Sequence, residues 1–312
     1  QRKFMFLFLA GYPIILYNRK NTVIIQRLVY QQVNVLNNLQ DSRLLNDYIQ
    51  SHYMSIFMPG KELNNDTIYS RLYRGDRISD PVIPILLVEW IIGKFSPMTK
   101  DVSSLRIIQA VFRFILWITG AKVTVIGEEN VPKDTPVLYI GNHRSYFDIL
   151  LTYSRCPIRT GYIAKKEMEK IPLLSTWMHY LHCLFLDRKD IKQGLKTILT
   201  AVDKVKSGIS ICIFPEGTRN RNQDELDMLP FHEGSFKIAT KTKCPVIPIA
   251  ISNSADIFEA HFPKIKPAKV VVEYGKPIYP DELSKEDKKH IGEYTQNIIH
   301  EMLVKNKPLT QN

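Results

Sequence analysis

The spacing of hydrophobic and polar residues changes near residue 122. From there on, short apolar runs rich in β-branched residues alternate with segments of helical periodicity. We predict strands at 122–126, 137–140, 209–214, 246–251 and 269–274, and helices at 146–153, 173–180, 191–206, 235–241 and 281–305. This alternation predicts an α/β fold with a largely parallel mixed sheet flanked by helices. In such folds the functional site lies at the carboxyl ends of the strands.

Residues 81–120 are strongly apolar, and we predict a helix at 105–119 with Ser103 or Ser104 as its N-cap. Arg106, Gln109 and Arg113 form a narrow polar stripe along that helix. A helix this apolar lies either in the core or in a bilayer interface, with its arginines directed at lipid phosphates.

The first 80 residues contain a second apolar segment, at 4–17. It is shorter than the roughly 20 residues that a spanning helix needs, and basic residues flank it. We interpret it as a membrane-inserted or interfacial segment, or as the remainder of a longer anchor that begins before Gln1. The alternative is a buried strand or helix. Residues 26–50 could also be helical.

The chain carries a formal net charge of +11 and four cysteines. The charge suits an anionic partner, which could be nucleic acid, a membrane surface or a phosphorylated substrate, although a generally basic surface would give the same total. We exclude nucleic acid because no basic patch is interleaved with aromatic residues and no zinc or helix-turn-helix pattern is present. No two cysteines form a CxxC pair, which argues against a metal site and favours a reducing compartment.

His143 and Asp148 follow an apolar run and are five positions apart. A neutral imidazole can take a proton from a hydroxyl, and a carboxylate can fix its tautomer. In a regular helix the two side chains would diverge by about 140°, so they meet only if the histidine precedes the helix and the aspartate lies in its first turn.

Ser145 is a suitable N-cap, and Asp148 three residues later completes a capping box. Capping alone is the alternative explanation of the pair. Since no nucleophile stands beside it, the pair points to a base that activates a substrate hydroxyl.

A second constellation, Phe-Pro-Glu-Gly-Thr-Arg at 214–219, follows a predicted strand. Gly217 permits a tight turn, and Thr218 and Arg219 supply donors. An arginine fork matches phosphate oxygens, and Glu216 could orient the arginine or a substrate hydroxyl. The alternative is an ordinary turn with a surface arginine.

Together these segments resemble the glycerolipid acyltransferases. Residues 142–148 resemble the family's His-x4-Asp motif, Phe-Leu-Asp-Arg at 185–188 its second block, 214–219 its third, and Val-Ile-Pro-Ile-Ala at 246–250 its fourth. The order and spacing agree over roughly 105–280. The resemblance is greatest to the bacterial 1-acyl-sn-glycerol-3-phosphate acyltransferases, which make phosphatidic acid, and it does not extend to residues 1–80.

The resemblance implies transfer of an acyl group from acyl-CoA or acyl-carrier protein to the sn-2 hydroxyl of lysophosphatidic acid, without cofactor or metal. His143 would be the base and Asp148 its orienting partner. The residues expected to bind the phosphate and glycerol are Lys165, Arg188, Glu216, Gly217, Thr218 and Arg219. Other lysophospholipids or glycerol-3-phosphate are alternative acceptors, and a non-catalytic lipid-binding protein is an alternative class.

We therefore expect three parts: an extension of unassigned role at 1–80, membrane-associated apolar helices at 81–120, and an acyltransferase domain at 121–312. The expected location is the cytoplasmic face of a bacterial cell membrane, where membrane lipids are further partners.

Overall fold

The computed structural model describes residues 6–9, 12–15, 82–171 and 173–311, which fall into two compact units, 1–91 and 92–312. In the first unit, strands β1 (Phe6–Leu9) and β2 (Tyr12–Ile15) pair in an antiparallel manner. The apolar segment at 4–17 thus contains strands. Helix α4 (Val82–Phe95) begins in this unit. The helix expected within 26–50 lies outside the described residues.

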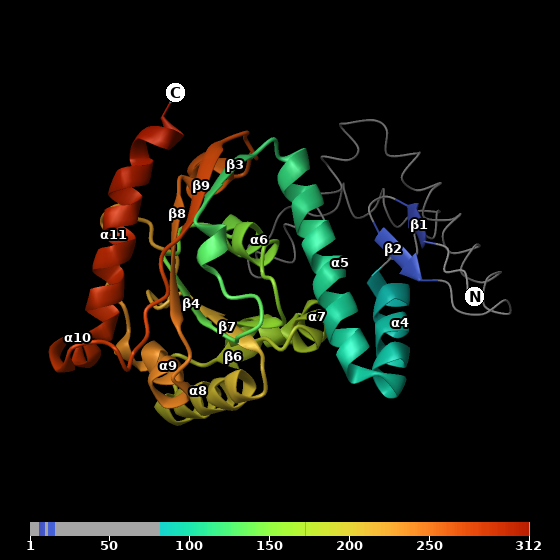
Figure 1. The fold of residues 1–312 in the computed structure, drawn as a ribbon. Coiled ribbons are helices and arrows are strands. Elements are labelled where there is room, and N and C mark those ends of the chain that lie inside the picture. Colours follow the sequence, from blue (N-terminus) through green and yellow to red (C-terminus); the bar gives the residue numbers. More distant parts are fainter. Residues whose placement is uncertain (1–5, 10–11, 16–81, 172, 312) are drawn as a thin grey trace, which may run out of the picture. The chain divides into compact units, whose positions relative to one another are not determined.

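The second unit is built on a seven-stranded sheet in the order β3-β9-β8-β4-β7-β5-β6 (Figure 1). Strands β8, β4, β7, β5 and β6 run parallel to one another, while β9 is antiparallel to β8 and parallel to β3. The predicted largely parallel mixed sheet is confirmed. The strands are β3 (Lys122–Ile126), β4 (Leu138–Gly141), β5 (Thr160–Lys165), β6 (Leu184–Leu186), β7 (Ser210–Ile213), β8 (Val246–Ser252) and β9 (Lys269–Tyr274).

The helices of this unit cover both faces of the sheet (Figure 1). They are α5 (Pro97–Ile118), α6 (Phe147–Tyr153), α7 (Leu174–Tyr180), α8 (Ile191–Lys206), α9 (Lys237–Thr242), α10 (Lys285–Lys289) and α11 (Ile291–Thr310). Short 3-10 helices lie at η1 (Glu128–Asn130), η2 (Lys166–Lys170), η3 (Glu233–Phe236), η4 (Ser254–Ile257) and η5 (Glu259–His261). The predicted helix at 281–305 is divided into α10 and α11, and the one at 235–241 begins as η3.

The main hydrophobic core lies between the central strands and helices α8, α9 and α11. Leu138 and Ile140 of β4, Ile211 of β7 and Leu303 of α11 are fully buried in it. Burial of such side chains contributes about 1.5–3 kcal/mol each. Because side chains alternate along a strand, Tyr139 belongs to the opposite face. The core therefore fixes the central strands whose carboxyl ends carry the predicted site.

Two parts of the sequence prediction for this unit need correction. Helix α5 begins at Pro97, eight residues before the predicted start, and Ser104 is buried inside it. Proline suits the first turn of a helix, where its missing N–H costs nothing. Strands β5 and β6 were not predicted. At β5, Gly161 lies so close to the carbonyl of His182 that any side chain would collide with it.

The described part of the chain contains no helix that is both long enough and apolar enough to span a bilayer. Helices α4 and α5 occupy most of residues 81–120, and their association with a membrane stays a prediction.

Candidate active site

The predicted site residues gather at one edge of the sheet. His143 follows β4 and residues 214–219 follow β7, while Lys165 ends β5 and Arg188 follows β6. These four strands are parallel, so their carboxyl ends lie at the same edge. The predicted location at the carboxyl ends of the strands agrees with this geometry.

His143 and Asp148 form a hydrogen-bonded pair, with 2.8 Å between Nδ1 and Oδ2. The histidine lies in the turn before α6 and the aspartate in its first turn. Oδ2 also accepts the backbone N–H groups of Arg144 (2.7 Å) and Ser145 (2.8 Å). An ionised carboxylate can only accept, so the imidazole donates through Nδ1–H. Its Nε2 is then left as the atom that can receive a proton.

The same aspartate holds the turn before α6, whose N-cap is Tyr146 without a side-chain capping bond, one residue after the predicted Ser145. Ser145 N–H donates to Asp148, and Ser145 Oγ accepts the N–H of Phe147 at 3.0 Å. Asp148 is fully buried, whereas the side chain of His143 is 15% exposed. One carboxylate oxygen therefore both binds the backbone of the turn before the helix and orients the imidazole.

Glu216 holds the backbone of His143. Its Oε1 accepts the N–H of His143 at 2.7 Å, and its Oε2 accepts the N–H of Leu229 at 3.0 Å. The side chain is 4% exposed, and burial raises its pKa. From the other side, Asn220 N–H donates to the carbonyl of His143 at 2.7 Å. Both Glu216 oxygens are thus used on the protein backbone, which fixes the histidine to the loop after β7.

The imidazole is also held by stacking. Its ring lies on that of Phe214, with 4.3 Å between centroids and 12° between planes. Gly141 makes room for this, since a Cβ there would approach Phe214 within 3.1 Å. Asn142, next in the chain, exchanges two hydrogen bonds with the backbone of Ile251 on β8, at 2.9 and 2.8 Å. Phe214 and Asn142 stand inside the motifs but were not among the predicted site residues.

Arg219 is joined to the histidine loop through Glu259. Its guanidinium contacts Glu259 Oε1 at 3.2 Å and Tyr146 Oη at 3.0 Å, and lies 3.7 Å from the centre of the Tyr146 ring. Glu259 also accepts from Ser145 Oγ (2.6 Å) and Tyr146 N–H (2.8 Å), and burial raises its pKa. Sequence reasoning missed Glu259, which stands outside every motif.

The remaining predicted residues lie around this group. Gly217 adopts a φ of 73° and thereby forms the turn, and Thr218 is exposed. Lys165 forms an exposed ion pair with Glu167 at 3.0 Å, and Arg188 is exposed after β6. Among the described residues no hydrogen bond or ion pair links Lys165 or Arg188 to the His143 group.

Fold and site define an α/β domain with a histidine–carboxylate pair at its strand ends. Residues 122–252 match the family model described as Acyltransferase. The fold of this domain is that of a solved 1-acyl-sn-glycerophosphate acyltransferase, PlsC from Thermotoga maritima. The TM-score is 0.59 at 25% identity, over 72% of this chain and 95% of that one.

Curated relatives carry the name 1-acyl-sn-glycerol-3-phosphate acyltransferase. The protein from Saccharomyces cerevisiae is 32% identical over 185 residues, which is 59% of this chain and 59% of the relative. The protein from Borreliella burgdorferi is 33% identical over 158 residues, 50% of this chain and 61% of the relative. The chain thus spans about three fifths of the length of these two relatives.

Proposed function

We propose that this protein transfers a fatty acyl group from an acyl thioester to the sn-2 hydroxyl of 1-acyl-sn-glycerol-3-phosphate, giving phosphatidic acid. The observation that carries the proposal is the His143–Asp148 pair, whose Nδ1–Oδ2 bond leaves Nε2 as the proton acceptor. The names of the relatives support this choice of acceptor.

In the proposed reaction His143 Nε2 takes the proton of the sn-2 hydroxyl, while the oxygen of that hydroxyl attacks the carbonyl carbon of the thioester. Asp148 stabilises the imidazolium that forms. The carbon–sulfur bond then breaks, and the imidazolium returns the proton to the leaving sulfur. No covalent intermediate on the protein is needed, because the acceptor brings its own nucleophile. The donor would be acyl-CoA or acyl-carrier protein.

The phosphate of the acceptor would meet the cations at the same edge. Arg219 supplies a fork that matches phosphate oxygens, and its contact with Glu259 sets its direction. Lys165 and Arg188, at the ends of β5 and β6, would add positive charge. Gly217 and Thr218 would shape the glycerol pocket. We assign Glu216 to holding His143, since both of its oxygens bind backbone N–H groups.

Both the acceptor and the acyl chain dissolve in a bilayer, so we place the enzyme at a membrane surface. Exposed apolar side chains on α5, among them Met98 and Trp117, support this placement. The cytoplasmic face is where acyl-CoA and acyl-carrier protein are found, and the bacterial cell membrane stays a prediction. The net charge of +11 would favour anionic lipid.

The test is thiol release by the purified protein in mixed micelles. The acceptors are lysophosphatidic acid, glycerol-3-phosphate and lysophosphatidylcholine, each supplied with acyl-CoA or acyl-carrier protein. We expect release that depends on an acceptor and is fastest with lysophosphatidic acid. Faster release with another acceptor would reassign the substrate. The absence of acceptor-dependent release with either donor would favour a lipid-binding protein without activity.

A further inference from the structure

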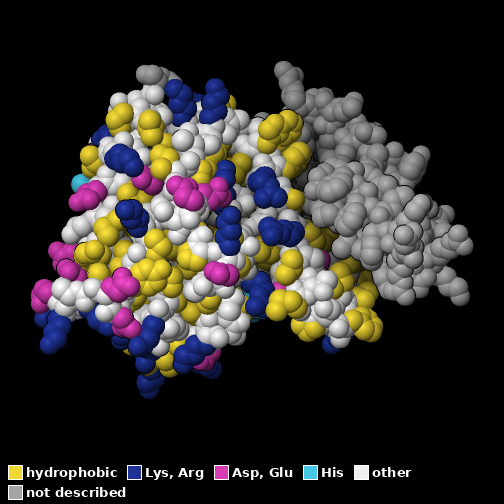
Figure 2. All heavy atoms as spheres, viewed as in Figure 1, with side chains coloured by type: hydrophobic (Ala, Val, Ile, Leu, Met, Phe, Trp, Pro, Cys, Tyr) yellow, Lys and Arg dark blue, Asp and Glu magenta, His cyan; other side chains and the backbone are white. Residues whose placement is uncertain are grey.

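A cavity of about 430 Å³ opens between α5, the η1 segment and the carboxyl end of α6. It lies within the second compact unit and falls in the size range of small-molecule sites. Four cations line it: Arg106 and Arg113 from α5, Lys133, and Arg155. Figure 2 shows Lys and Arg side chains over the part of the surface where Figure 1 places α5 and α6.

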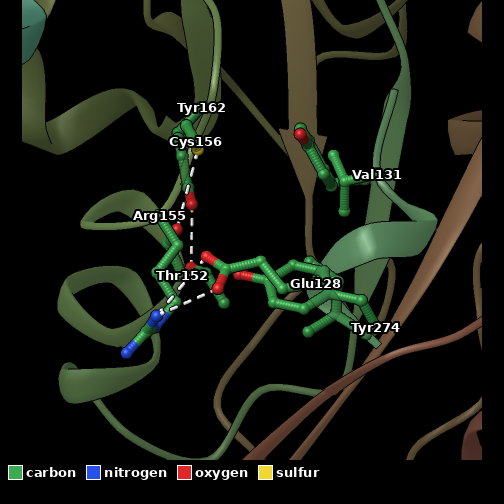
Figure 3. Close-up of a pocket in the computed structure, with 9 residues that line it drawn as sticks. Glu128, Val131, Thr152, Arg155, Cys156, Tyr162 and Tyr274 are labelled. Carbon is green, nitrogen blue, oxygen red and sulfur yellow. Dashed lines mark hydrogen bonds and ion pairs between the residues drawn. The ribbon is translucent and has the colours of Figure 1, made fainter. Parts of the chain in front are cut away.

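The described part of the chain does not neutralise the positive charge of this cavity. Among the described residues, Glu128 is the one carboxylate in its lining, and it pairs with Arg155 at 3.4 Å. Figure 3, a close-up of a pocket that shares these two residues, shows the pair. That pair is partly exposed to solvent, which weakens it. Arg106 donates to the neutral Oε1 of Gln109 at 3.0 Å, and Arg113 donates to the carbonyl of Ser154 at 3.1 Å. Each guanidinium has five N–H donors, so most of them remain available to a ligand.

The carboxyl end of α6, which forms part of the cavity wall, does not repel an anion. Carbonyl groups at the carboxyl end of a helix normally repel negative charge. Here Gln109 donates to the carbonyls of Cys156 (2.7 Å) and Tyr153 (3.3 Å), and Arg113 donates to that of Ser154. Because these carbonyls already have donors, the cations set the character of the cavity.

The exposed face of α5 on either side of the arginines is apolar. Val102, four residues before Arg106, is 44% exposed, and Trp117, four residues after Arg113, is 74% exposed. Residues four apart share a helix face. Apolar side chains with cations between them suit the headgroup level of a bilayer, where tryptophan is enriched.

We propose that this cavity binds the phosphate group of an anionic phospholipid of the bilayer, at a site separate from that of the acceptor. The cavity lies at the carboxyl end of α6, whereas Asp148 is in its first turn. The inference rests on the proposed action at a membrane surface. A free phosphate ion would use the same donors, and the experiment separates the two sources.

The test compares the unmodified protein with the variant Arg106→Gln/Lys133→Gln. These two residues are chosen because neither bonds to the end of α6. The matched control, Lys237→Gln/Lys241→Gln, removes two exposed cations of α9. Binding is measured by sedimentation with phosphatidylcholine vesicles containing phosphatidylglycerol, and with vesicles of phosphatidylcholine alone. Competition by inorganic phosphate and activity on a short-chain, water-soluble lysophosphatidate are measured in parallel.

We expect the preference for anionic vesicles to fall about tenfold in the Arg106/Lys133 variant and by less than twofold in the control. Activity on the soluble acceptor should be unchanged, and millimolar inorganic phosphate should compete only weakly. An equal loss in the two variants would overturn the proposal, as would full retention of the preference. Full competition by inorganic phosphate would overturn the lipid as the source. Lack of acyl transfer in the unmodified protein would refute the proposed function and leave the binding comparison intact.

Discussion

The carboxylate of Glu216 accepts the backbone N–H of His143 at 2.7 Å, so that the loop after β7 fixes the position of the residue that follows β4. The second oxygen of the same carboxylate accepts the N–H of Leu229 at 3.0 Å. Glutamine in place of Glu216 could accept only one of these N–H groups and would direct an amide N–H at the other.

We therefore predict that Glu216→Gln lowers kcat about 10- to 100-fold, because a small displacement of the base costs catalysis directly. KM for the acceptor should change little, and steady-state kinetics separate the two effects. Glu225→Gln is the control, since Glu225 is partly buried and accepts the N–H of Asn253. Equal kinetics of the Glu216 and Glu225 variants would refute the positioning role.

Arg219 is predicted to act on the acceptor's phosphate. Arg219→Gln should raise KM for lysophosphatidic acid about tenfold, and should affect a monoacylglycerol acceptor, which has no phosphate, by less than threefold. Arg221→Gln is the control, because Arg221 is an exposed arginine two residues away. If the Arg219 variant loses activity equally on both acceptors, then Arg219 only supports Glu259 and Tyr146.

Gln109 ties α5 to the end of α6 through two carbonyls, and it is 1% exposed. Leucine has a similar size but donates no hydrogen bond. We expect Gln109→Leu to lower the free energy of unfolding by about 2–3 kcal/mol, as measured by urea denaturation. The exposed Gln223→Leu should stay within about 0.5 kcal/mol of the parent. A Gln109 variant as stable as the parent would show that these carbonyls are not a stabilising contact.

A second histidine–aspartate contact makes stability depend on pH. His182 Nε2 lies 2.8 Å from Asp101 Oδ2, with Arg159 and Lys204 nearby, and desolvation lowers the pKa of His182. As the pH falls, His182 therefore binds a proton at a higher pH in the unfolded chain than in the folded protein. The stabilising contribution is full above the ordinary pKa of histidine, about 6.5, and is lost as pH falls from there to the lowered value.

Urea denaturation at pH 7.5 and pH 5.0 tests this prediction. The parent should lose more stability between the two values than His182→Asn, in which no group titrates at this position. Asparagine is chosen because residue 182 has a φ of 59°, a conformation that asparagine tolerates. Equal losses in parent and variant would contradict the assignment.

The sequence pattern predicted much of the fold. Within the site it predicted the contact between His143 and Asp148, but not the residues that hold this pair in place. The strands at 122–126 and 269–274 and the helix at 191–206 have the predicted bounds. The five-residue spacing and Ser145 together predicted how His143 meets Asp148. Strand β6 has only three residues, too few for a periodic signal. The partners Glu259 and Ile251 meet the histidine loop through tertiary contacts alone.

His143 is predicted to remove the proton of the acceptor's hydroxyl. The most direct measurement is acceptor-dependent thiol release by His143→Ala, beside His232→Ala as a control histidine that lies next to Gly217 and is exposed. We predict that the His143 variant loses at least 10³-fold in kcat, with its fold and lysolipid binding retained, while the His232 variant stays within about threefold. Activity of the His143 variant within tenfold of the parent would contradict the account.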